Sequence, residues 1–313
     1  MRAKNKVGLF AYGEMGTSAV ETLIKDFDLL WVIVQDNTPV KELANNLKIK
    51  TIQANSEKEI FNLVKNTHPD VVVICSYNKI LSAKILKLTK FMNVHHGDLP
   101  RWRGRANINW AIILGRKEIG LTFHEATPDL DAGNIYAQYM IPINQEDSVK
   151  TIYDKVNLIT KENMAEIVKK VLKGYRGLKQ KGSPTYCCTR LPEDGYIDWT
   201  KSTQEIFNMI RALTRPYPGA FTYFEGKKMI VWDSEIAKNL RVYEGRIPGR
   251  IVMVHKKYGV EVLTGDSSII IKNIHYEDKE INASEVITSV KKTLGINIVE
   301  TYETLVKLLQ QQK

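Results

Sequence analysis

Three residue types that together support acyl transfer occur in one part of the chain. Asn93 and His95 are two residues apart, and Asp131 follows in an Asp-Ala-Gly turn. On a β-strand, a spacing of two points both side chains to the same face. An amide can donate hydrogen bonds to a developing oxyanion, and an imidazole can move protons near neutral pH. Asp131 is distant in sequence, so only the fold can bring its carboxylate to His95.

A cluster of arginines follows the histidine. Arg101, Arg103 and Arg105, hereafter the arginine cluster, lie within five residues, with Trp102 between the first two. Such a cluster is either a solvated loop or an anion clamp, because guanidinium groups bind phosphate in a bidentate manner. The cluster lies close in sequence to Asn93 and His95, and this position favours the anion clamp.

Other polar motifs have simpler interpretations. Gly13–Gly16 follows an apolar run but lacks the Gly-x-Gly-x-x-Gly spacing of a dinucleotide site, so we expect a tight strand–helix turn. The loop at Asp129 resembles a calcium loop, but Met140 stands where a bidentate glutamate would be needed. His96 and His124 are expected to be structural or solvated.

Composition indicates a soluble protein of two domains. The chain has 313 residues, which is long for one domain, and 43% of them are hydrophobic. No stretch approaches the roughly 18 uncharged apolar residues of a membrane span. Cys75, Cys187 and Cys188 fit neither a disulfide framework nor a zinc pattern, which favours a reducing cytoplasm and no bound metal. The net charge of +10 fits either a plain basic enzyme or one with a polyanionic partner, such as RNA or a phosphate-rich substrate.

Apolar strands alternate with amphipathic helices in the first half of the chain. This alternation predicts a mostly parallel sheet covered on both faces, with ligands at the carboxyl ends of the strands. The segment from Asn93 to Arg105 follows such a strand. The expected strands are Val7–Tyr12, Leu29–Val34, Val71–Cys75, Met92–His95, Ile119–Glu125 and Tyr136–Ile143, and the expected helices are Thr17–Ile24, Val40–Leu47, Glu57–Val64 and Val149–Leu172.

A second, smaller unit is expected after the linker-like stretch 182–192, which contains glycine, serine and proline. Thr203–Leu213 has helical spacing, and further helices are expected over Val286–Thr293 and Thr301–Gln310. Several short strands separated by turn signals are typical of a small barrel or sandwich. These strands are Phe221–Phe224, Met229–Asp233, Arg250–Val254, Val260–Leu263 and Ile269–Ile274.

On these motifs, the chain resembles the folate-dependent formyltransferase family. Asn93-Val94-His95, the segment Leu99–Gly104 and Asp131-Ala132-Gly133 are similar to its signature blocks and occur in the same order. The resemblance implies an α/β fold with a Rossmann-like core of mostly parallel sheet and a small, β-rich, OB-like C-terminal domain. The implied divisions are a catalytic domain at 1–185, a linker at 186–200 and the C-terminal domain at 201–313.

The resemblance also implies a reaction. N10-formyltetrahydrofolate would be the donor and a primary amine the acceptor, with no metal. Asn93 would stabilise the oxyanion, His95 would move the proton, and Asp131 would hold the imidazole. The folate ring would bind to the loop after the third long strand, at Tyr77, Asn78, Lys79, Ile80 and Leu81.

The resemblance further implies that the acceptor is a nucleotide-linked amino sugar. Phe10–Gly16 and Arg215–Tyr223 are similar to sugar N-formyltransferases, in particular those acting on nucleotide-linked 4-amino-4-deoxyarabinose, a lipopolysaccharide or O-antigen sugar. The arginine cluster would then meet the acceptor's phosphates. Asp98 departs from the family pattern, and it would either bind the cationic amino sugar or alter the packing of the loop.

Two alternatives to the sugar acceptor stay open. Methionyl-tRNA formyltransferases are similar across the same blocks, which makes tRNA the second candidate acceptor. A non-catalytic RNA-binding protein is the third candidate, but its barrel strands lack a dense stripe of arginine and aromatic residues. It also leaves Asn93, His95 and Asp131 without a role. An exposed small barrel would also suit a homodimer contact.

Overall fold

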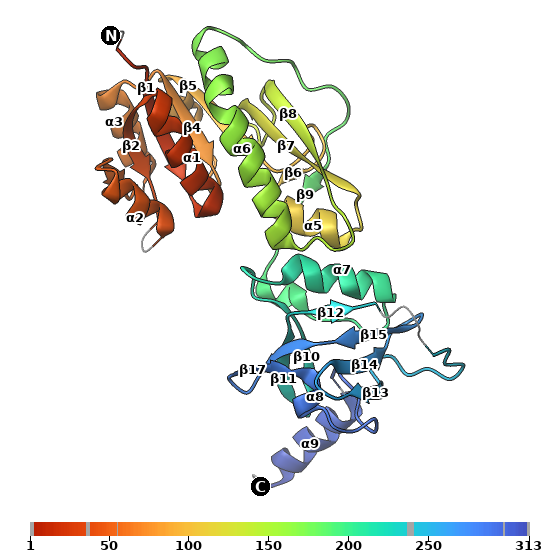
Figure 1. The fold of residues 1–313 in the computed structure, drawn as a ribbon. Helices are drawn as coiled ribbons and strands as arrows, with labels where there is room; N and C mark the ends of the chain where they lie inside the picture. The colour runs from red at the N-terminus through yellow and green to blue at the C-terminus, as the bar shows by residue number, and fades with distance from the viewer. Residues whose placement is uncertain (1–2, 36–37, 55, 237–240, 297, 312–313) are drawn as a thin grey trace. The chain divides into compact units, whose positions relative to one another are not determined.

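The computed structural model describes residues 3–311, apart from 36–37, 55, 237–240 and 297. The chain divides into two compact units, which are described separately (Figure 1). The first contains Met1–Ile108, Lys117–Asn144 and Thr151–Thr189, and the second contains Asn109–Arg116, Gln145–Lys150 and Arg190–Lys313. All the candidate site residues lie in the first unit. The limits 1–185, 186–200 and 201–313 stay a prediction.

A seven-stranded sheet with the order β3-β2-β1-β4-β5-β7-β8 forms the centre of the first unit. The pairs among β3, β2, β1, β4 and β5 are parallel, whereas β7 and β8 add an antiparallel edge. The expected α/β core with a mostly parallel sheet is confirmed. The strands are β1 (Lys6–Ala11), β2 (Asp28–Ile33), β3 (Thr51–Ile52), β4 (Val71–Cys75), β5 (Lys90–His95), β7 (Glu118–Glu125) and β8 (Ile135–Pro142).

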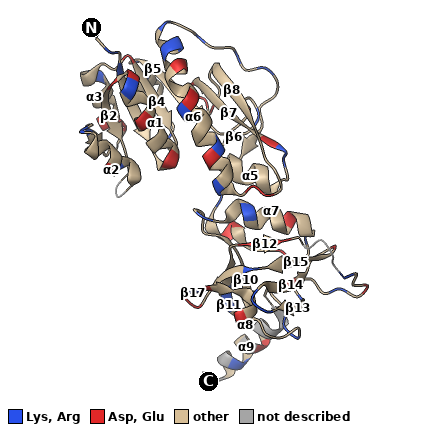
Figure 2. Cartoon of the chain, viewed as in Figure 1, with Lys and Arg blue, Asp and Glu red and all other residues tan. Residues whose placement is uncertain are grey.

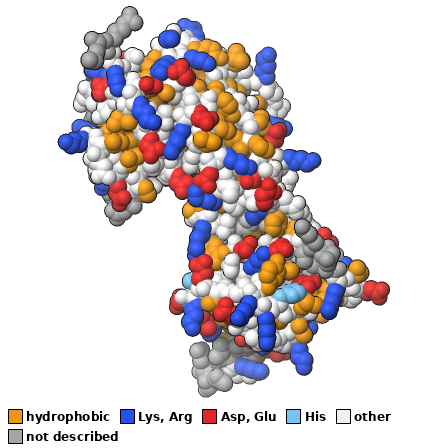
Figure 3. Space-filling view, viewed as in Figure 1, with side chains coloured by type: hydrophobic (Ala, Val, Ile, Leu, Met, Phe, Trp, Pro, Cys, Tyr) orange, Lys and Arg blue, Asp and Glu red, His pale blue; other side chains and the backbone are white. Residues whose placement is uncertain are grey.

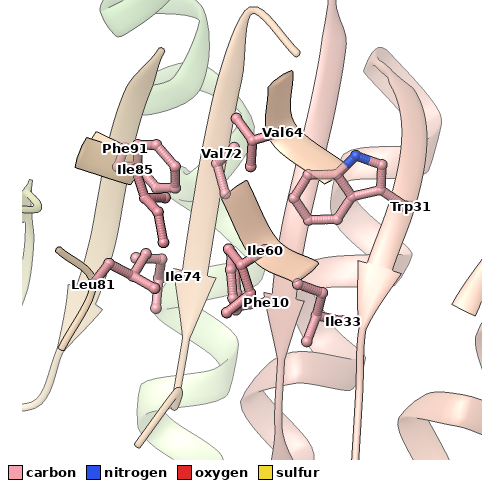
Figure 4. Packing of buried hydrophobic residues seen from close by; sticks show 10 residues of the cluster. All are labelled: Phe10, Trp31, Ile33, Ile60, Val64, Val72, Ile74, Leu81, Ile85 and Phe91. Atoms are coloured by element: carbon pink, nitrogen blue, oxygen red, sulfur yellow. The ribbon is translucent and has the colours of Figure 1, made fainter. Parts of the chain in front are cut away.

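Helices cover both faces of this sheet. On one face, side chains of α3 and α4 pack with buried residues of β1, β2, β4 and β5, and the ribbons of α1 and α6 pass on the other side (Figure 4). Phe10 in this cluster is fully buried, and burying such a side chain contributes about 1.5–3 kcal/mol. The helices are α1 (Gly13–Asp26), α2 (Pro39–Asn46), α3 (Glu57–Thr67), α4 (Ala83–Leu86) and α6 (Val149–Leu172), and α5 (Asn107–Ile113) begins in this unit.

The antiparallel edge determines which residues face each other at the end of β5. Asn93 pairs with His124, and His95 pairs with Thr122, across β5 and β7. Directly opposite residues on antiparallel strands have Cβ atoms about 4.5–5.5 Å apart, so His124 lies beside Asn93. The loop between β7 and β8 returns Asp131 to this same end of the sheet.

Within the first unit, the segment after α6 packs against the loops that carry the candidate site. β6 (Arg103–Gly104) and β9 (Tyr186–Cys187) form a two-stranded parallel sheet. Leu178 and Ile135 exchange two backbone hydrogen bonds, each 2.8 Å long. The composition of 182–192 predicted a linker, but β9 lies within that stretch. Residues 178–187 therefore contact the loops that carry the candidate site.

The second unit contains two four-stranded antiparallel sheets, with the orders β10-β11-β16-β17 and β12-β15-β14-β13. The expected β-rich C-terminal region is confirmed. The predicted strand Ile269–Ile274 is two strands, because the chain passes from one sheet to the other at Lys272. The strands are β10 (Ala220–Phe224), β11 (Lys227–Val231), β12 (Ser234–Glu235), β13 (Ile251–His255), β14 (Gly259–Leu263), β15 (Ser268–Ile271), β16 (Asn273–Tyr276) and β17 (Lys279–Asn282).

One helix of the second unit was predicted in the wrong place. In this part of the chain the helix is α8 (Ala283–Val286), whereas we expected a helix over Val286–Thr293. The backbone of the following residues pairs with another segment, since Ile251 N–H donates to the Lys292 carbonyl at 3.1 Å. This stretch is rich in β-branched residues, which have low helix propensity. The other elements are α7 (Thr203–Leu213), α9 (Ile298–Gln311) and the 3₁₀ turn η1 (Pro192–Gly195).

Charged side chains are spread over the surface. Figures 2 and 3 show Lys and Arg interspersed with Asp and Glu on the visible face of each unit. Among the described residues, no helix combines the length and apolarity that crossing a bilayer requires.

Candidate functional site

Asn93, His95 and Asp131 meet at the carboxyl end of β5. His95 Nδ1 lies 3.5 Å from Asp131 Oδ2, and Asn93 Nδ2 lies 3.5 Å from Asp131 Oδ1. His95 is 7% exposed, and the Asp131 side chain is 10% exposed. β5 supplies the amide and the imidazole, and the β7–β8 loop supplies the carboxylate. The three residues selected from the sequence are therefore neighbours in the fold.

The Asp131 carboxylate is held by several donors. Its Oδ2 accepts a hydrogen bond from Gly104 N–H at 2.9 Å. Burial raises the pKa of this carboxyl, but its contacts with His124 and His95 and the hydrogen bond from the Gly104 N–H outweigh burial and lower the pKa to about 2. Asp131 is therefore an anion at physiological pH.

Both ring nitrogens of His95 face polar partners. Nδ1 faces Asp131, and Nε2–H donates to the Trp102 carbonyl at 2.6 Å. Asn107, which is 3% exposed, donates to the same carbonyl at 2.5 Å. Burial lowers the pKa of His95, and the Asp131 carboxylate and the Trp102 carbonyl oppose this shift. The imidazole is thus fixed in one orientation, and no sequence pattern had indicated the part of Asn107.

Two glycines leave room for these contacts. At Gly97, a Cβ atom would lie 2.7 Å from the Trp102 oxygen and 2.8 Å from His95 Nε2. At Gly133, a Cβ atom would lie 2.0 Å from the Glu125 carbonyl oxygen. Glycine lacks this atom, so the backbone can approach the site closely at both positions.

His124 is a fourth polar residue of this site. Its Nδ1–H donates to the Glu125 carbonyl at 2.7 Å, so Nε2 accepts from Asn93 Nδ2 at 3.0 Å. Nε2 also lies 3.6 Å from Asp131 Oδ1. The sequence interpretation treated His124 as structural or solvated and missed these contacts. The cross-strand pairing of His124 with Asn93 is the signal that could have indicated them.

The arginine cluster does not converge on one point. Arg101 forms an ion pair with Asp98, with its Nε 2.8 Å from Oδ2. Arg103 Nη2 donates to Gln180 Oε1 at 2.7 Å, and Arg105 is exposed. Asp98 is 9% exposed, so its contact with Arg101 packs the loop that follows β5.

The loop after β4 begins at the same end of the sheet, because β4 and β5 are parallel neighbours. Tyr77 and Leu81 pack against the apolar cluster of Figure 4, whereas Asn78, Lys79 and Ile80 are exposed. The ends of this loop are thus anchored, and its middle is open to a ligand. This position agrees with the general rule that ligands bind beyond the carboxyl ends of parallel strands.

Cysteines and metal ligands add nothing to this site. In the described ranges, no group of three or more His, Cys, Asp or Glu side chains could hold a metal ion. Cys75, Cys187 and Cys188 form no disulfide. Burial, with a smaller contribution from Cys188, raises the pKa of Cys187 to about 11, so that thiol is protonated at neutral pH.

Comparison with known proteins assigns the chain to a family. Residues 32–168 match the family "Formyl transferase", and residues 191–291 match "Formyl transferase, C-terminal domain". A methionyl-tRNA formyltransferase of Caldanaerobacter subterraneus subsp. tengcongensis is 32% identical over 283 residues, which cover 84% of this chain and 90% of that protein. The chain belongs to the formyl transferase family.

This formyl transferase also matches other proteins, one by sequence and one by structure. The bifunctional polymyxin resistance protein ArnA of Wigglesworthia glossinidia brevipalpis is 33% identical over 327 residues. The match covers 97% of this chain but only 48% of ArnA, so the chain spans about half the length of that relative. An N-formyltransferase structure from Helicobacter canadensis, in complex with folinic acid and dTDP-3-aminofucose, has a TM-score of 0.62 at 21% identity. That alignment covers 85% of this chain and 98% of the other, and it shows a shared fold.

We expect His124→Phe to lower the turnover of this formyl transferase by about 10- to 100-fold, because Asn93 loses the acceptor that orients its amide. His124→Gln should retain more activity, since its side-chain oxygen can accept the same hydrogen bond. Steady-state kcat of both variants, with thermal unfolding as the folding control, tests this expectation. Wild-type turnover in the phenylalanine variant would remove His124 from the site.

Proposed function

We propose that the chain transfers a formyl group from N10-formyltetrahydrofolate to the primary amine of a nucleotide-linked amino sugar. The observation that carries this proposal is the meeting of Asn93, His95 and Asp131 at one strand end. An amide donor, an imidazole and a buried carboxylate are the groups needed to pass an acyl group between two nitrogens. We assign this chemistry to the proposed catalytic domain, residues 1–185.

The amide of Asn93 is proposed to stabilise the oxyanion. The neutral amine attacks the formyl carbon, and negative charge develops on the formyl oxygen. One N–H of Asn93 is bound by His124 at 3.0 Å, while the other points toward Asp131 at 3.5 Å, which is long for a hydrogen bond. To bind the formyl oxygen, this second hydrogen has to exchange its weak contact with the Asp131 carboxylate for the new acceptor. In other enzymes, a donor of this kind contributes roughly 3–4 kcal/mol.

His95 is proposed to move the proton. It either accepts a proton from the ammonium that forms when the neutral amine has attacked, or delivers one to N10 as tetrahydrofolate leaves. Asp131 favours the protonated imidazole because the two groups lie 3.5 Å apart in a buried site. Since Nε2–H is bound to the Trp102 carbonyl, accepting a proton at this nitrogen requires that the carbonyl gives way and that the ring proton moves to Nδ1, beside Asp131.

The folate ring is proposed to bind at Tyr77, Asn78, Lys79, Ile80 and Leu81. Support comes from the position of this loop beside β5 and from its exposed middle section. The Helicobacter canadensis structure holds folinic acid, which is a formylated folate. Apolar surface with a few polar atoms suits such a ring.

The acceptor site is proposed to include Asp98 and the arginine cluster. Arg105 is exposed, and Arg101 is 62% exposed despite its pairing with Asp98, so both guanidinium groups are accessible to a phosphate. The Helicobacter canadensis protein holds a nucleotide-linked amino sugar, and this likeness supports a sugar acceptor.

A tRNA acceptor is the second candidate, and the identity of 32% to a methionyl-tRNA formyltransferase favours it specifically. Such an enzyme needs a basic strip along the acceptor stem, and its activity should fall steeply with salt. The face visible in Figure 3 shows basic and acidic side chains intermixed, which supports the smaller acceptor.

A panel of acceptors tests the proposed function. The protein is incubated with formyltetrahydrofolate and with UDP-, dTDP- and GDP-linked amino sugars or methionyl initiator tRNA. We expect a mass gain of about 28 Da, the mass of CO, on one nucleotide sugar, with little dependence on salt. If the tRNA alone is formylated, and this activity is lost at high salt, the tRNA acceptor replaces the nucleotide sugar in the proposal. A panel without any formylated product would overturn both.

A further inference from the structure

Gln180 lies between the two loops that shape the candidate site, and both N–H groups and the oxygen of its side-chain amide form hydrogen bonds. Its Nε2 donates to the Asp131 carbonyl and to the Gly133 carbonyl, each at 2.8 Å. Its Oε1 accepts from Arg103 Nη2 at 2.7 Å. One side chain thus bonds the main chain of the Asp131 turn and the side chain of the β6 arginine.

The segment around Gln180 is fixed to the same two loops by its backbone. On one side, Leu178 and Ile135 exchange two hydrogen bonds of 2.8 Å next to the Asp131 turn. On the other side, Arg103 N–H donates to the Thr185 carbonyl at 2.9 Å, at the start of the β6–β9 pairing. Backbone hydrogen bonds on both sides of Gln180 therefore fix the segment that places its side chain at these contacts.

The Asp131 turn needs such support. Asp131 has a φ of +47°, a left-handed conformation that a non-glycine residue adopts at a cost. Its carbonyl and that of Gly133 point to one donor group, the Gln180 amide. The Asp131 carboxylate also bonds Gly104 N–H, so the turn and the β6 loop meet at both the side chain and the backbone.

Arg103 is bound in the same place. Its Nε is buried and finds no hydrogen-bond partner among the described residues, which leaves the Gln180 oxygen as an important anchor for this guanidinium. Burying a polar group without a partner is unfavourable, so the remaining bond from Nη2 to Gln180 matters for the position of Arg103.

We propose that Gln180 is a positioning residue for formyl transfer: it holds the Asp131 turn in register with His95 through the Asp131 and Gly133 carbonyls. This inference rests on the proposed function. Loss of the amide would release both carbonyls, let the left-handed residue relax and move the carboxylate away from the imidazole. A displacement of about 1 Å at a reacting group can cost about 100-fold in rate.

Two variants of Gln180 separate its contacts. Gln180→Met keeps the length of the side chain but removes all three hydrogen bonds. Gln180→Glu keeps an oxygen for Arg103 but turns the amide donor into a second oxygen facing two carbonyls. Lys179→Ala, at the exposed preceding residue, is the matched control. Thermal unfolding confirms that each protein is folded.

Kinetics form the first measurement. We expect both Gln180 variants to lower kcat by about 10- to 100-fold while the KM for formyltetrahydrofolate changes little, and we expect the control to resemble wild type. Wild-type kcat in both variants would overturn the proposal. Wild-type kcat in the glutamate variant alone would also overturn the proposal, because the Arg103 contact, and not the carbonyl contacts, would then carry the effect.

Titration of His95 by NMR forms the second measurement and needs no acceptor. Moving the Asp131 carboxylate away removes a neighbour that favours the imidazolium, so the His95 midpoint should shift to lower pH in Gln180→Met, whose side chain adds no charge. An unchanged midpoint would count against the positioning role even if the panel revealed no acceptor. Failure of the acceptor panel alone would count only against the proposed function.

Discussion

Replacement of His95 by alanine is expected to reduce formyl transfer by about 10²- to 10⁴-fold while the protein stays folded. The imidazole lies 3.5 Å from the Asp131 carboxylate and two residues from the amide of Asn93, so it is the group placed to move a proton during the reaction. The measurement is kcat with the acceptor identified by the panel, together with the far-ultraviolet circular dichroism of the variant.

The neighbouring histidine provides a matched control for this variant. The His96 ring packs against Tyr153 with centroids 5.6 Å apart, and burial together with the charge of His95 lowers its pKa to about 3. His96 is thus neutral at working pH and packs on Tyr153, so His96→Gln should leave turnover roughly unchanged. Turnover near wild type in His95→Ala would remove His95 from the mechanism.

Asp131→Asn should lower turnover to a similar degree and change its pH dependence. Because the carboxylate is an anion with a pKa of about 2, it favours the protonated form of His95 at every working pH. Without this charge, the pKa of His95 falls further below its ordinary value. If His95 accepts the proton, the rising acidic limb of kcat moves to lower pH. If His95 donates the proton, the falling alkaline limb moves to lower pH.

A second property of the Asp131 variant can be checked without substrate. The folded pKa of Asp131 is depressed from 3.8 to about 2, so its contribution to stability is present above pH ~4 and is lost as the pH falls toward 2. Asp131→Asn should therefore lower the free energy of unfolding by about 2 kcal/mol at neutral pH, and the difference should vanish near pH 2. A difference that does not depend on pH would show that the carboxylate is not anchored as described.

The common position of Asn93 and His95 at one strand end could be predicted from the sequence because it depends on local rules. Two-residue spacing on a strand aligns Asn93 with His95, and alternating strands and helices place them at a carboxyl edge. Such local rules could not predict the positions of His124 and Gln180. The position of His124 depends on the antiparallel pairing of β7 with β5, and that of Gln180 depends on a segment that returns to the core after α6.

The surroundings of the arginine cluster could not be predicted for a related reason. Spacing in sequence indicated a joint clamp, but Arg101 pairs with a carboxylate three residues earlier and Arg103 pairs with Gln180, 77 residues later. Side-chain partners of a loop depend on what packs over it. The predicted helix at Val286–Thr293 was wrong because its residues bond a distant segment, which local periodicity does not reveal.

The bond between His95 Nε2 and the Trp102 carbonyl has a consequence for water. An imidazole with partners at both nitrogens has none left to activate a solvent molecule. We infer that the resting protein is guarded against hydrolysing its own donor, because the imidazole can serve as a base only after the Trp102 carbonyl has left Nε2 and the ring proton has moved to Nδ1.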